Sequence, residues 1–382
     1  MFKRRFVSIL LCVSVIASLA LPMSVNAVSA ESITATSAIL MEASTGKVLF
    51  EKNSHEQRPC ASITKVMTML LVCEAIDSGK LSLDDMVTSS AHAAGMGGSD
   101  IWLEEGEMMS VHDMIKATVV ASANDAAVAL AEHLYGSEEA FVSKMNEKAK
   151  ALGMNDTVFK NCNGLDEEGH LTSAYDVAVM SKELMKHEMI FEYTSIWLDN
   201  LRDGKTQIVN TNKLLKTYNG ITGLKTGTTD DAGCCMSASA TRDNLSLVAV
   251  VLGCGTGKER FADAAALLDY GFANYSVKEL SLPKDFTNII KVENGMAENV
   301  GISCEVKGNV VLDKNSQTEI KENLKLPEKV TAPITKGQKI GTLTYSTQDE
   351  TIYTFDIVAD SEVEEISFEA VLLVLLNSII SL

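Results

Sequence analysis

Strand-like patterns on both sides of a helical block limit the fold of this 382-residue chain most strongly. Residues 37–50 alternate loosely between apolar and polar around a Ser44-Thr45-Gly46 turn, which predicts a hairpin. Helical periodicity then dominates from Ser62 to about Leu152. After Gly223 the pattern changes to two paired strands and a closing helix, expected at residues 234–240, 245–252 and 259–274. One sheet built from both ends of a domain around inserted helices predicts an α+β fold.

Four helices are expected inside this block, each ended by a glycine or a change of pattern, at residues 62–78, 111–119, 122–135 and 138–152. After Tyr275 short Val- and Ile-rich runs alternate with turn signals, which predicts a small all-β domain. The expected organisation is a leader at 1–30, a catalytic domain at 31–275, a β-rich domain at 276–360 and a tail at 361–382.

The first thirty residues have the layout of a secretory signal peptide. Lys3, Arg4 and Arg5 precede an apolar run to about Leu21, and small residues follow, with cleavage expected after Ala27 or Ala30. The alternative is an uncleaved membrane anchor, although the apolar run is shorter than a usual membrane span. Either reading places the rest of the chain outside the cytoplasm.

Charge and cysteine content exclude several classes of function. The net charge is −18, and it becomes −21 without the leader, which carries three basic and no acidic residues. A protein this acidic is a poor candidate for binding nucleic acid. Without Cys12 of the leader seven of the eight cysteines remain, and an odd number with irregular spacing argues against a disulfide framework. No C-x-x-C or H-E-x-x-H pattern occurs, so neither a metal nor another cofactor is expected.

The tail predicts an amphipathic helix at a membrane surface. An apolar run from Val371 follows Glu362, Glu364, Glu365 and Glu369, and no Lys or Arg follows Lys339. Attachment would therefore depend on apolar side chains, without attraction to anionic headgroups. The alternative is a terminal helix packed on protein or a frayed end.

Three short patterns carry the chemistry: S-x-x-K at Ser62–Lys65, S-x-N at Ser122–Asn124, and K-T-G beginning at Lys225. Ser62 opens a long apolar helix, and residues three apart share a helix face, so the Lys65 amine can reach the Ser62 hydroxyl. The start of a helix also offers unpaired N–H groups that can stabilise an oxyanion. Ser62 could instead be a plain N-cap, but the other two motifs favour a nucleophile.

The order and spacing of the motifs resemble the serine penicillin-recognising enzymes, which include DD-peptidases and serine β-lactamases. The surrounding residues are more similar to the low-molecular-mass D-alanyl-D-alanine carboxypeptidases. The similar stretches are Pro59-Cys60-Ala61-Ser62, Asn163-Gly164-Leu165, Gly223 to Thr229 and Ala238 to Asp243. The resemblance covers roughly residues 33–275, and the β-rich segment resembles the C-terminal domain of the same enzymes.

This resemblance implies that Ser62 attacks the penultimate D-alanine carbonyl of a peptidoglycan stem peptide and forms an acyl-enzyme. Lys65 would be the base, with a pKa lowered by burial and by the cation of Lys225. Ser122, expected to open its own helix, would pass a proton to the leaving D-alanine, and Asn124 would orient Lys65 and bind the peptide amide of the substrate. β-Lactam antibiotics would then be covalent inhibitors.

The same resemblance assigns the terminal carboxylate of the substrate to Thr226 and Thr228, and the Thr228 N–H to the oxyanion hole beside the Ser62 N–H. Arg242 is a further candidate for the carboxylate, although a surface charge at a strand turn is the more common meaning of such a residue. His170 stands in a Gly-rich loop and is expected to be structural.

Three alternatives to a carboxypeptidase remain open. A DD-endopeptidase would use the same acylation machinery on a different leaving group. A serine β-lactamase would share Ser62, Lys65 and Lys225, but its second motif is more often S-D-N than Ser122-Ala123-Asn124, and the additional β domain favours the peptidase. A wall-binding protein with a vestigial site is disfavoured by the intact motifs.

Overall fold

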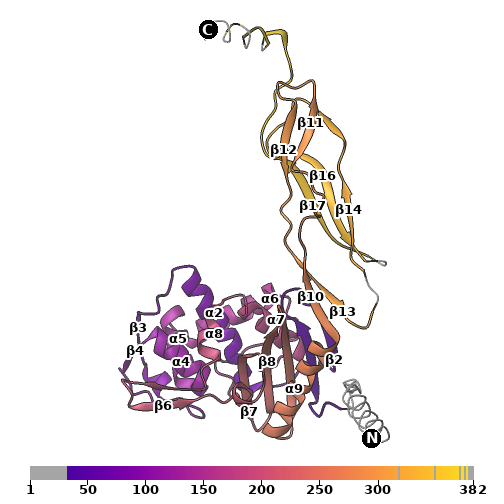
Figure 1. Cartoon of the computed structure of the whole chain (residues 1–382). Coiled ribbons are helices and arrows are strands. Elements are labelled where there is room, and N and C mark those ends of the chain that lie inside the picture. The colour runs from indigo at the N-terminus through magenta and orange to yellow at the C-terminus, as the bar shows by residue number, and fades with distance from the viewer. Residues whose placement is uncertain (1–31, 317–318, 348–349, 370, 374–375, 377–382) are drawn as a thin grey trace, which may run out of the picture. The chain divides into compact units, whose positions relative to one another are not determined.

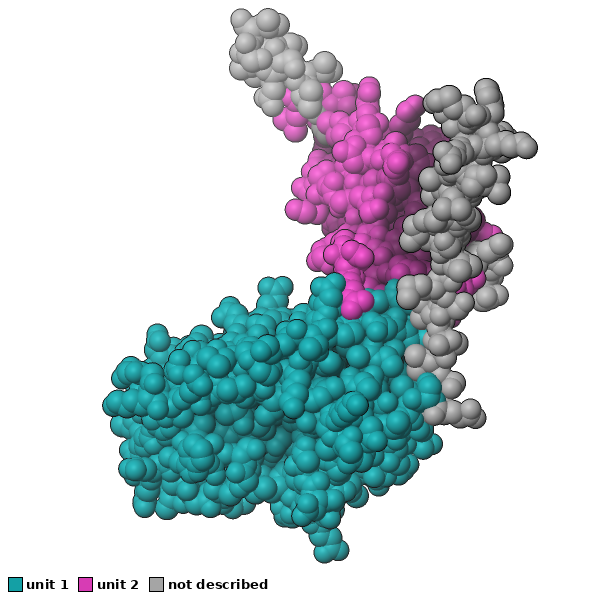
Figure 2. Space-filling view, turned by 60° about the horizontal axis from the view of Figure 1, so that its bottom comes forward, with its two compact units in different colours: residues 1–41, 48–240, 247–273 teal, residues 42–47, 241–246, 274–382 magenta. Residues whose placement is uncertain are grey.

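The computed structural model describes residues 32–316, 319–347, 350–369, 371–373 and 376, so the expected leader lies outside the described residues. The chain forms two compact units, traced in Figure 1 and coloured separately in Figure 2. Of the described residues, the first comprises 32–41, 48–240 and 247–273, and the second comprises 42–47, 241–246 and those from 274 onward.

An antiparallel five-stranded sheet with the order β2-β1-β9-β8-β7 forms the centre of the first unit. Its strands are β1 (Ser37–Glu42), β2 (Val48–Lys52), β7 (Ile221–Thr229), β8 (Gly233–Arg242) and β9 (Leu245–Cys254). The first two strands and the last three are separated by the helical block, which confirms the predicted α+β fold. Because β7 is an edge strand, one of its sides is open to a ligand.

The helical block lies beside this sheet, and α9 (Gly257–Asn274) lies against it (Figure 1). Helix α9 packs through Gly271, where an added Cβ would lie 2.5 Å from Leu247 and 2.9 Å from Leu40. The block contains α2 (Lys65–Asp77), α3 (Ala91–Ala94), α4 (Val111–Lys116), α5 (Asn124–Tyr135), α6 (Glu138–Ala151), α7 (Ala174–Leu184) and α8 (Ile190–Thr194). Ten of the thirteen α2 residues are buried, so α2 is the central helix of the block.

Short elements complete the first unit. The hairpins are β3 (Met86–Thr88) with β4 (Met108–Ser110), and β5 (Leu198–Leu201) with β6 (Thr206–Val209). Three single turns are η1 (Ala61–Thr64), η2 (Ala117–Ala121) and η3 (Lys213–Lys216). Ser110 and Ser137 accept N–H bonds at the starts of α4 and α6, as N-cap serines do.

One helix start differs from the prediction. The segment expected to be helical at 111–119 changes after Lys116 into the π turn η2, and Ser122 follows in a left-handed conformation with φ 62°. Helix α5 begins at Asn124, so Ser122 does not open it. The irregular turn places Ser122 between two helices, with its side chain directed by the turn rather than by a helix face.

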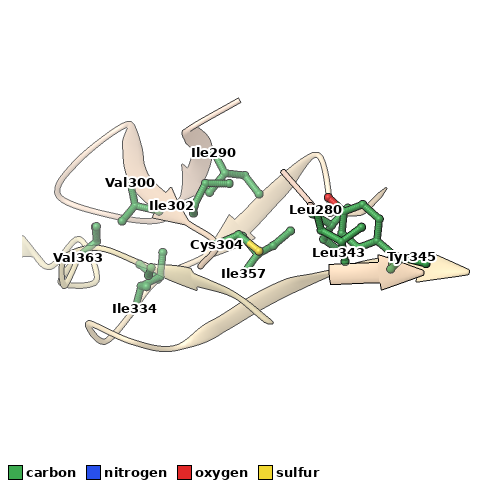
Figure 3. Packing of buried hydrophobic residues seen from close by; sticks show 13 residues of the cluster. Leu280, Ile290, Val300, Ile302, Cys304, Ile334, Leu343, Tyr345, Ile357 and Val363 are labelled. Carbon is green, nitrogen blue, oxygen red and sulfur yellow. The ribbon is translucent and has the colours of Figure 1, made fainter. Parts of the chain in front are cut away.

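The second unit is all-β, as predicted. Its main sheet has the order β14-β16-β17-β12-β11-β15, and a smaller sheet pairs β10 with β13. The strands are β10 (Tyr275–Glu279), β11 (Ile289–Glu293), β12 (Asn299–Ser303), β13 (Asn309–Asp313), β14 (Lys321–Lys325), β15 (Lys329–Thr331), β16 (Lys339–Ser346) and β17 (Thr351–Ala359). Figure 3 shows apolar side chains of several strands, among them Ile290, Ile302, Leu343 and Ile357, forming its core.

The β pairing extends past the expected domain end at residue 360. Val363 is buried in the same core, and its N–H and carbonyl both bond Ile334. The Ile366 N–H bonds the carbonyl of Asn294. Residues 363–366 are therefore part of the paired β structure of the second unit, and only the chain after them is available as a tail.

All seven cysteines among the described residues are free, and six of them are buried. Burial raises the pKa of the Cys60, Cys73 and Cys254 thiols to about 12. No helix among the described residues is both long enough and apolar enough to cross a membrane.

Candidate active site

Ser62 lies in η1, the single turn that leads into α2. Two glycines from distant segments pack directly on this turn. An added Cβ at Gly164 would lie 2.0 Å from the Ala61 carbonyl oxygen, and one at Gly227 would lie 2.6 Å from the Cys60 carbonyl oxygen. Only glycine allows the backbones to approach so closely. The nucleophile turn is therefore held between β7 and the loop that carries Gly164.

Gly164→Ala should displace this turn, whereas Gly153→Ala should not. Both glycines have positive φ, 88° and 74°, so both variants incur the strain of a left-handed alanine, about 1 kcal/mol. Only Gly164 has backbone atoms within 4 Å of the added Cβ. We expect Gly164→Ala to lower penicillin acylation at least tenfold, and Gly153→Ala to leave its rate unchanged. Acylation rates and melting curves of the two variants measure this, and equal acylation rates would refute the packing argument.

The Lys65 amine has three oxygen neighbours: Asn124 Oδ1 at 2.6 Å, the Asn163 carbonyl at 2.7 Å and Ser62 Oγ at 3.0 Å. A neutral amine has two hydrogens and one lone pair. If the two amide oxygens accept both hydrogens, the lone pair is directed at the Ser62 hydroxyl. Lys65 is only 1% exposed, and this burial lowers its pKa to about 7. The residue is therefore able to act as a base near neutral pH.

Ser122 and Lys225 form a second buried pair on the other side of the site. Lys225 Nζ lies 2.8 Å from Ser122 Oγ and 2.9 Å from the Thr226 carbonyl. Burial lowers the pKa of Lys225 well below its usual value, and the charges of Lys65 and Arg260 lower it further. Of the two causes expected for the lowered Lys65 pKa, burial is the main one, and the cation of Lys225 is not among the causes.

Asn124 links the second motif to the first. Its Oδ1 accepts the Lys65 bond, its Nδ2 donates to the Gly97 carbonyl at 2.7 Å, and its backbone N–H donates to the Ser99 carbonyl at 2.7 Å. These contacts fix the orientation of the Asn124 side-chain amide, with its oxygen facing Lys65 and its nitrogen facing Gly97. The second motif thus orients Lys65 and also fixes the loop that begins at Gly97.

The C-terminal end of β7, here called its open end, carries the hydroxyl groups of Thr226 and Thr228. An arginine that was not predicted from the sequence lies beside them. Arg260, in the first turns of α9, donates to Thr228 Oγ1 at 2.9 Å and to the Gly227 carbonyl at 2.9 Å. Thr226 Oγ1 lies 2.6 Å from Thr211 Oγ1. A cation near a helix N-terminus is disfavoured by the helix dipole, and this was the one signal in the sequence that could have identified Arg260.

The structure does not bring Arg242 to this end of the sheet. Arg242 is the last residue of β8, five residues beyond Ser237, and Ser237 is the partner of Lys225 in the strand register. At about 3.3 Å per residue this separation is roughly 16 Å along the strand. Arg260, rather than Arg242, is the guanidinium in contact with Thr228.

His170 is not placed as a base. Its Nδ1 accepts the Lys160 N–H at 3.1 Å, which leaves Nε2 to donate to Thr64 Oγ1 at 2.8 Å. Burial lowers the pKa of His170 to about 4, so the neutral ring is retained at ordinary pH. His170 therefore supports the η1 turn from behind through Thr64.

A cavity of about 380 Å³ lies beside η1 and is lined partly by Ala61, Gly164, Leu165 and Asp231. Ser62, Lys65 and Lys225 are not among the residues that line it, so this cavity lies beside the nucleophile turn and does not contain the three motifs. Among residues 32–369 and the few described beyond them, no group of three or more His, Cys, Asp or Glu side chains could hold a metal ion.

Comparisons with known proteins agree with this arrangement. Residues 24–256 match the family described as D-alanyl-D-alanine carboxypeptidase. The chain belongs to this family. Residues 280–365 match the C-terminal domain of penicillin-binding protein 5.

Two curated relatives and two solved structures illustrate the family. D-alanyl-D-alanine carboxypeptidase DacF of Bacillus subtilis is 44% identical over 338 residues, 87% of each chain. DacC of Escherichia coli is 34% identical, with 89% of this chain and 87% of that protein covered. Penicillin-binding protein 5 of Haemophilus influenzae has a TM-score of 0.73 at 30% identity, with 87% of this chain and 98% of that chain covered. Ampicillin-bound penicillin-binding protein D2 of Listeria monocytogenes has a TM-score of 0.58 at 33% identity, with 63% of this chain and 98% of that chain covered.

This member of the D-alanyl-D-alanine carboxypeptidase family is accordingly a serine-type peptidase and a penicillin-binding protein. The relatives carry carboxypeptidase names, and the chain has the additional C-terminal domain, so the β-lactamase alternative is not favoured.

Proposed function

We propose that Ser62 is the nucleophile with which this carboxypeptidase removes the terminal D-alanine from peptidoglycan stem pentapeptides. The observation that supports this most directly is the set of three bonds around Lys65, which directs its lone pair at Ser62 Oγ. The test is incubation of the protein without its leader with a pentapeptide muropeptide and, separately, with a cross-linked muropeptide dimer, followed by mass analysis. We expect the pentapeptide to lose one alanine; no loss from it, or cleavage of the dimer only, would overturn the proposal.

In the proposed acylation step, Lys65 takes the hydroxyl proton as Ser62 Oγ bonds to the carbonyl carbon of the penultimate D-alanine. The carbonyl oxygen becomes an oxyanion between the N–H groups of Ser62 and Thr228. The C–N bond to the last D-alanine then breaks, and its nitrogen receives a proton through Ser122. Water later attacks the ester carbonyl and gives up a proton through Ser122 to Lys225, which had protonated the leaving nitrogen. The C–O bond to Ser62 then breaks, Lys65 returns its proton to Ser62 Oγ, and the shortened peptide is released.

The terminal carboxylate of the substrate is proposed to lie at the open end of β7, within reach of Thr226, Thr228 and Arg260. A bound carboxylate adds a negative charge close to Lys225, and this raises the pKa of that lysine. Lys225 would then acquire its proton as the substrate binds, and it could donate through Ser122 toward the leaving nitrogen.

Arg260→Ala should raise KM for a D-alanyl-D-alanine peptide by about ten- to a hundredfold, because a charged hydrogen bond to a carboxylate contributes about 1.5–3 kcal/mol. Arg242→Ala is the matched control and should leave KM unchanged, since Arg242 lies at the far end of β8. Steady-state kinetics of both variants measure this. A larger rise in KM for Arg242→Ala than for Arg260→Ala would instead assign carboxylate binding to Arg242.

The leader and the tail are proposed to place the enzyme outside the cytoplasm, attached to the outer face of the cytoplasmic membrane. The support for attachment is a group of exposed apolar side chains that follow the β pairing of the second unit, Phe368, Val371, Leu372, Leu373 and Leu376. The rest of the expected apolar run, including Ile379 and Ile380, lies outside the described residues.

Truncation after Ser367 should separate attachment from activity, because it keeps the bonds of residues 363–366 to the second unit. The chain without its leader should sediment with neutral phosphatidylcholine vesicles even at high salt, since hydrophobic burial is not screened. The truncated chain should stay in solution and retain full activity. A full-length chain that stays in solution at low salt would refute the anchor.

A further inference from the structure

We propose that Trp102 is a specificity-determining residue that binds a sugar ring of the glycan strand to which the stem peptide is attached. Trp102 is a large apolar side chain that is 77% exposed, the second most exposed of the large hydrophobic side chains described after Phe368. Exposing an indole forfeits the stabilisation that its burial would give. The inference rests on the proposed function, since it concerns how the same site selects its substrate.

The backbone around Trp102 is tightly held. The N–H groups of Ile101 and Leu103 donate to the buried carboxylate of Asp125 at 3.1 and 3.0 Å. Arg202 donates to the Ile101 carbonyl at 2.9 Å and forms an ion pair with Glu107. Trp102 itself has φ 55°, a conformation that a bulky residue adopts only when its surroundings impose it. The indole is thus presented to solvent on a fixed support.

This support is part of the active site. Asp125 directly follows Asn124, and the loop carrying Trp102 begins where Asn124 bonds the Gly97 and Ser99 carbonyls. A Cβ added at Gly98 would lie 2.9 Å from the Asn124 amide nitrogen. Trp102 lies four residues after Gly98, so its Cα lies at most about 14 Å from the Gly98 Cα, which packs on Asn124.

A residue at this distance from Asn124 is better placed to contact the sugar than the scissile end of the peptide. Three stem residues and a lactyl group separate the acylated D-alanine from the glycan, and at about 3.3–3.6 Å per residue they span roughly 10–14 Å. A pyranose ring has one face of C–H groups, which packs on an indole, and a rim of hydroxyl donors. Asp100, Glu104 and Glu105 flank Trp102 and offer carboxylate acceptors for such donors. These acidic groups also disfavour an anionic ligand.

The test compares two substrates, a disaccharide pentapeptide and the same pentapeptide without sugars. Trp102→Ala should raise KM for the disaccharide substrate about three- to tenfold with kcat unchanged, and it should leave both constants for the bare peptide unchanged. Trp102→Phe should restore most of the loss. Leu198→Ala, at a 48% exposed apolar residue of β5, is the matched control and should leave KM and kcat unchanged for both substrates.

Each outcome separates this inference from the proposed function. Release of D-alanine by the wild-type protein, with Trp102→Ala equal to wild type on both substrates, would overturn the sugar contact alone. Equal losses on both substrates would assign Trp102 to the support of Asn124 rather than to sugar binding, and so would also overturn it. No release by the wild-type protein from either substrate would overturn the proposed function and, with it, this inference.

Discussion

Ser62→Ala is expected to abolish covalent labelling by benzylpenicillin and to reduce D-alanine release by on the order of 10⁴-fold or more, since removal of a nucleophile that works with a base eliminates the covalent route. In the wild-type protein, mass spectrometry of peptides should find a single adduct, at Ser62. An adduct on any other residue, or persistent labelling of the variant, would contradict the assignment of the nucleophile.

The fold should tolerate this change. Ser62 is only partly buried, and its side chain bonds one group, the Lys65 amine. Loss of one such bond costs about 1 kcal/mol, which shifts the Tm by no more than about 4 °C in a protein of this size. A melting curve recorded beside the labelling experiment therefore distinguishes a missing nucleophile from an unfolded site.

The acylation rate of the wild-type protein is expected to fall about tenfold for each pH unit below 7 and to be constant just above it. The lowered pKa of Lys65, about 7, means that the amine is neutral above this pH and protonated below it. Only the neutral amine can accept the Ser62 proton, so activity is lost on the acid side. Second-order rate constants for penicillin acylation between pH 5 and 8.5 measure this profile.

Replacement of the two lysines should have unequal effects. Lys65→Arg introduces a permanent cation that cannot accept a proton, so acylation should fall by about 10²- to 10⁴-fold at every pH, and the acid limb should disappear. Lys225→Arg supplies the positive charge that Lys225 is proposed to acquire when the substrate binds, and it keeps hydrogen-bond donors near Ser122, so a measurable fraction of the rate should remain. Equal losses in both variants would contradict the separate roles.

Periodicity in the sequence was sufficient for the architecture but not for its irregular turns. The sheet strands and the helices around residues 65–77, 124–135 and 138–151 lie close to their predicted positions, because apolar spacing and terminal glycines mark them directly. The π turn at Ala117–Ala121 and the left-handed Ser122 were not predicted, since they depend on packing around the site. Helix α7 was likewise missed, although Ser173 supplies an N-cap for it.

The motifs brought the right groups to one site but did not show how they interact. The proximity of Ser62 to Lys65 could be derived from helix spacing, because both residues belong to one local segment. The contact of Arg260 with Thr228 joins residues 32 positions apart on different elements, and no local pattern encodes it. The relative weight of the two causes expected for the lowered Lys65 pKa, burial and the neighbouring cation, also required the packed structure, in which burial dominates.

The thiols of the buried, unpaired cysteines differ in reactivity between the folded and the unfolded chain. Thiolates, not thiols, react with oxidants and disulfides, and burial in the folded protein keeps thiols such as Cys60, Cys73 and Cys254 protonated. An unfolded chain loses this protection, and all of its thiols return to ordinary reactivity. Resistance to oxidation is thus acquired by folding, and the time a new chain spends unfolded sets its exposure to mispaired disulfides.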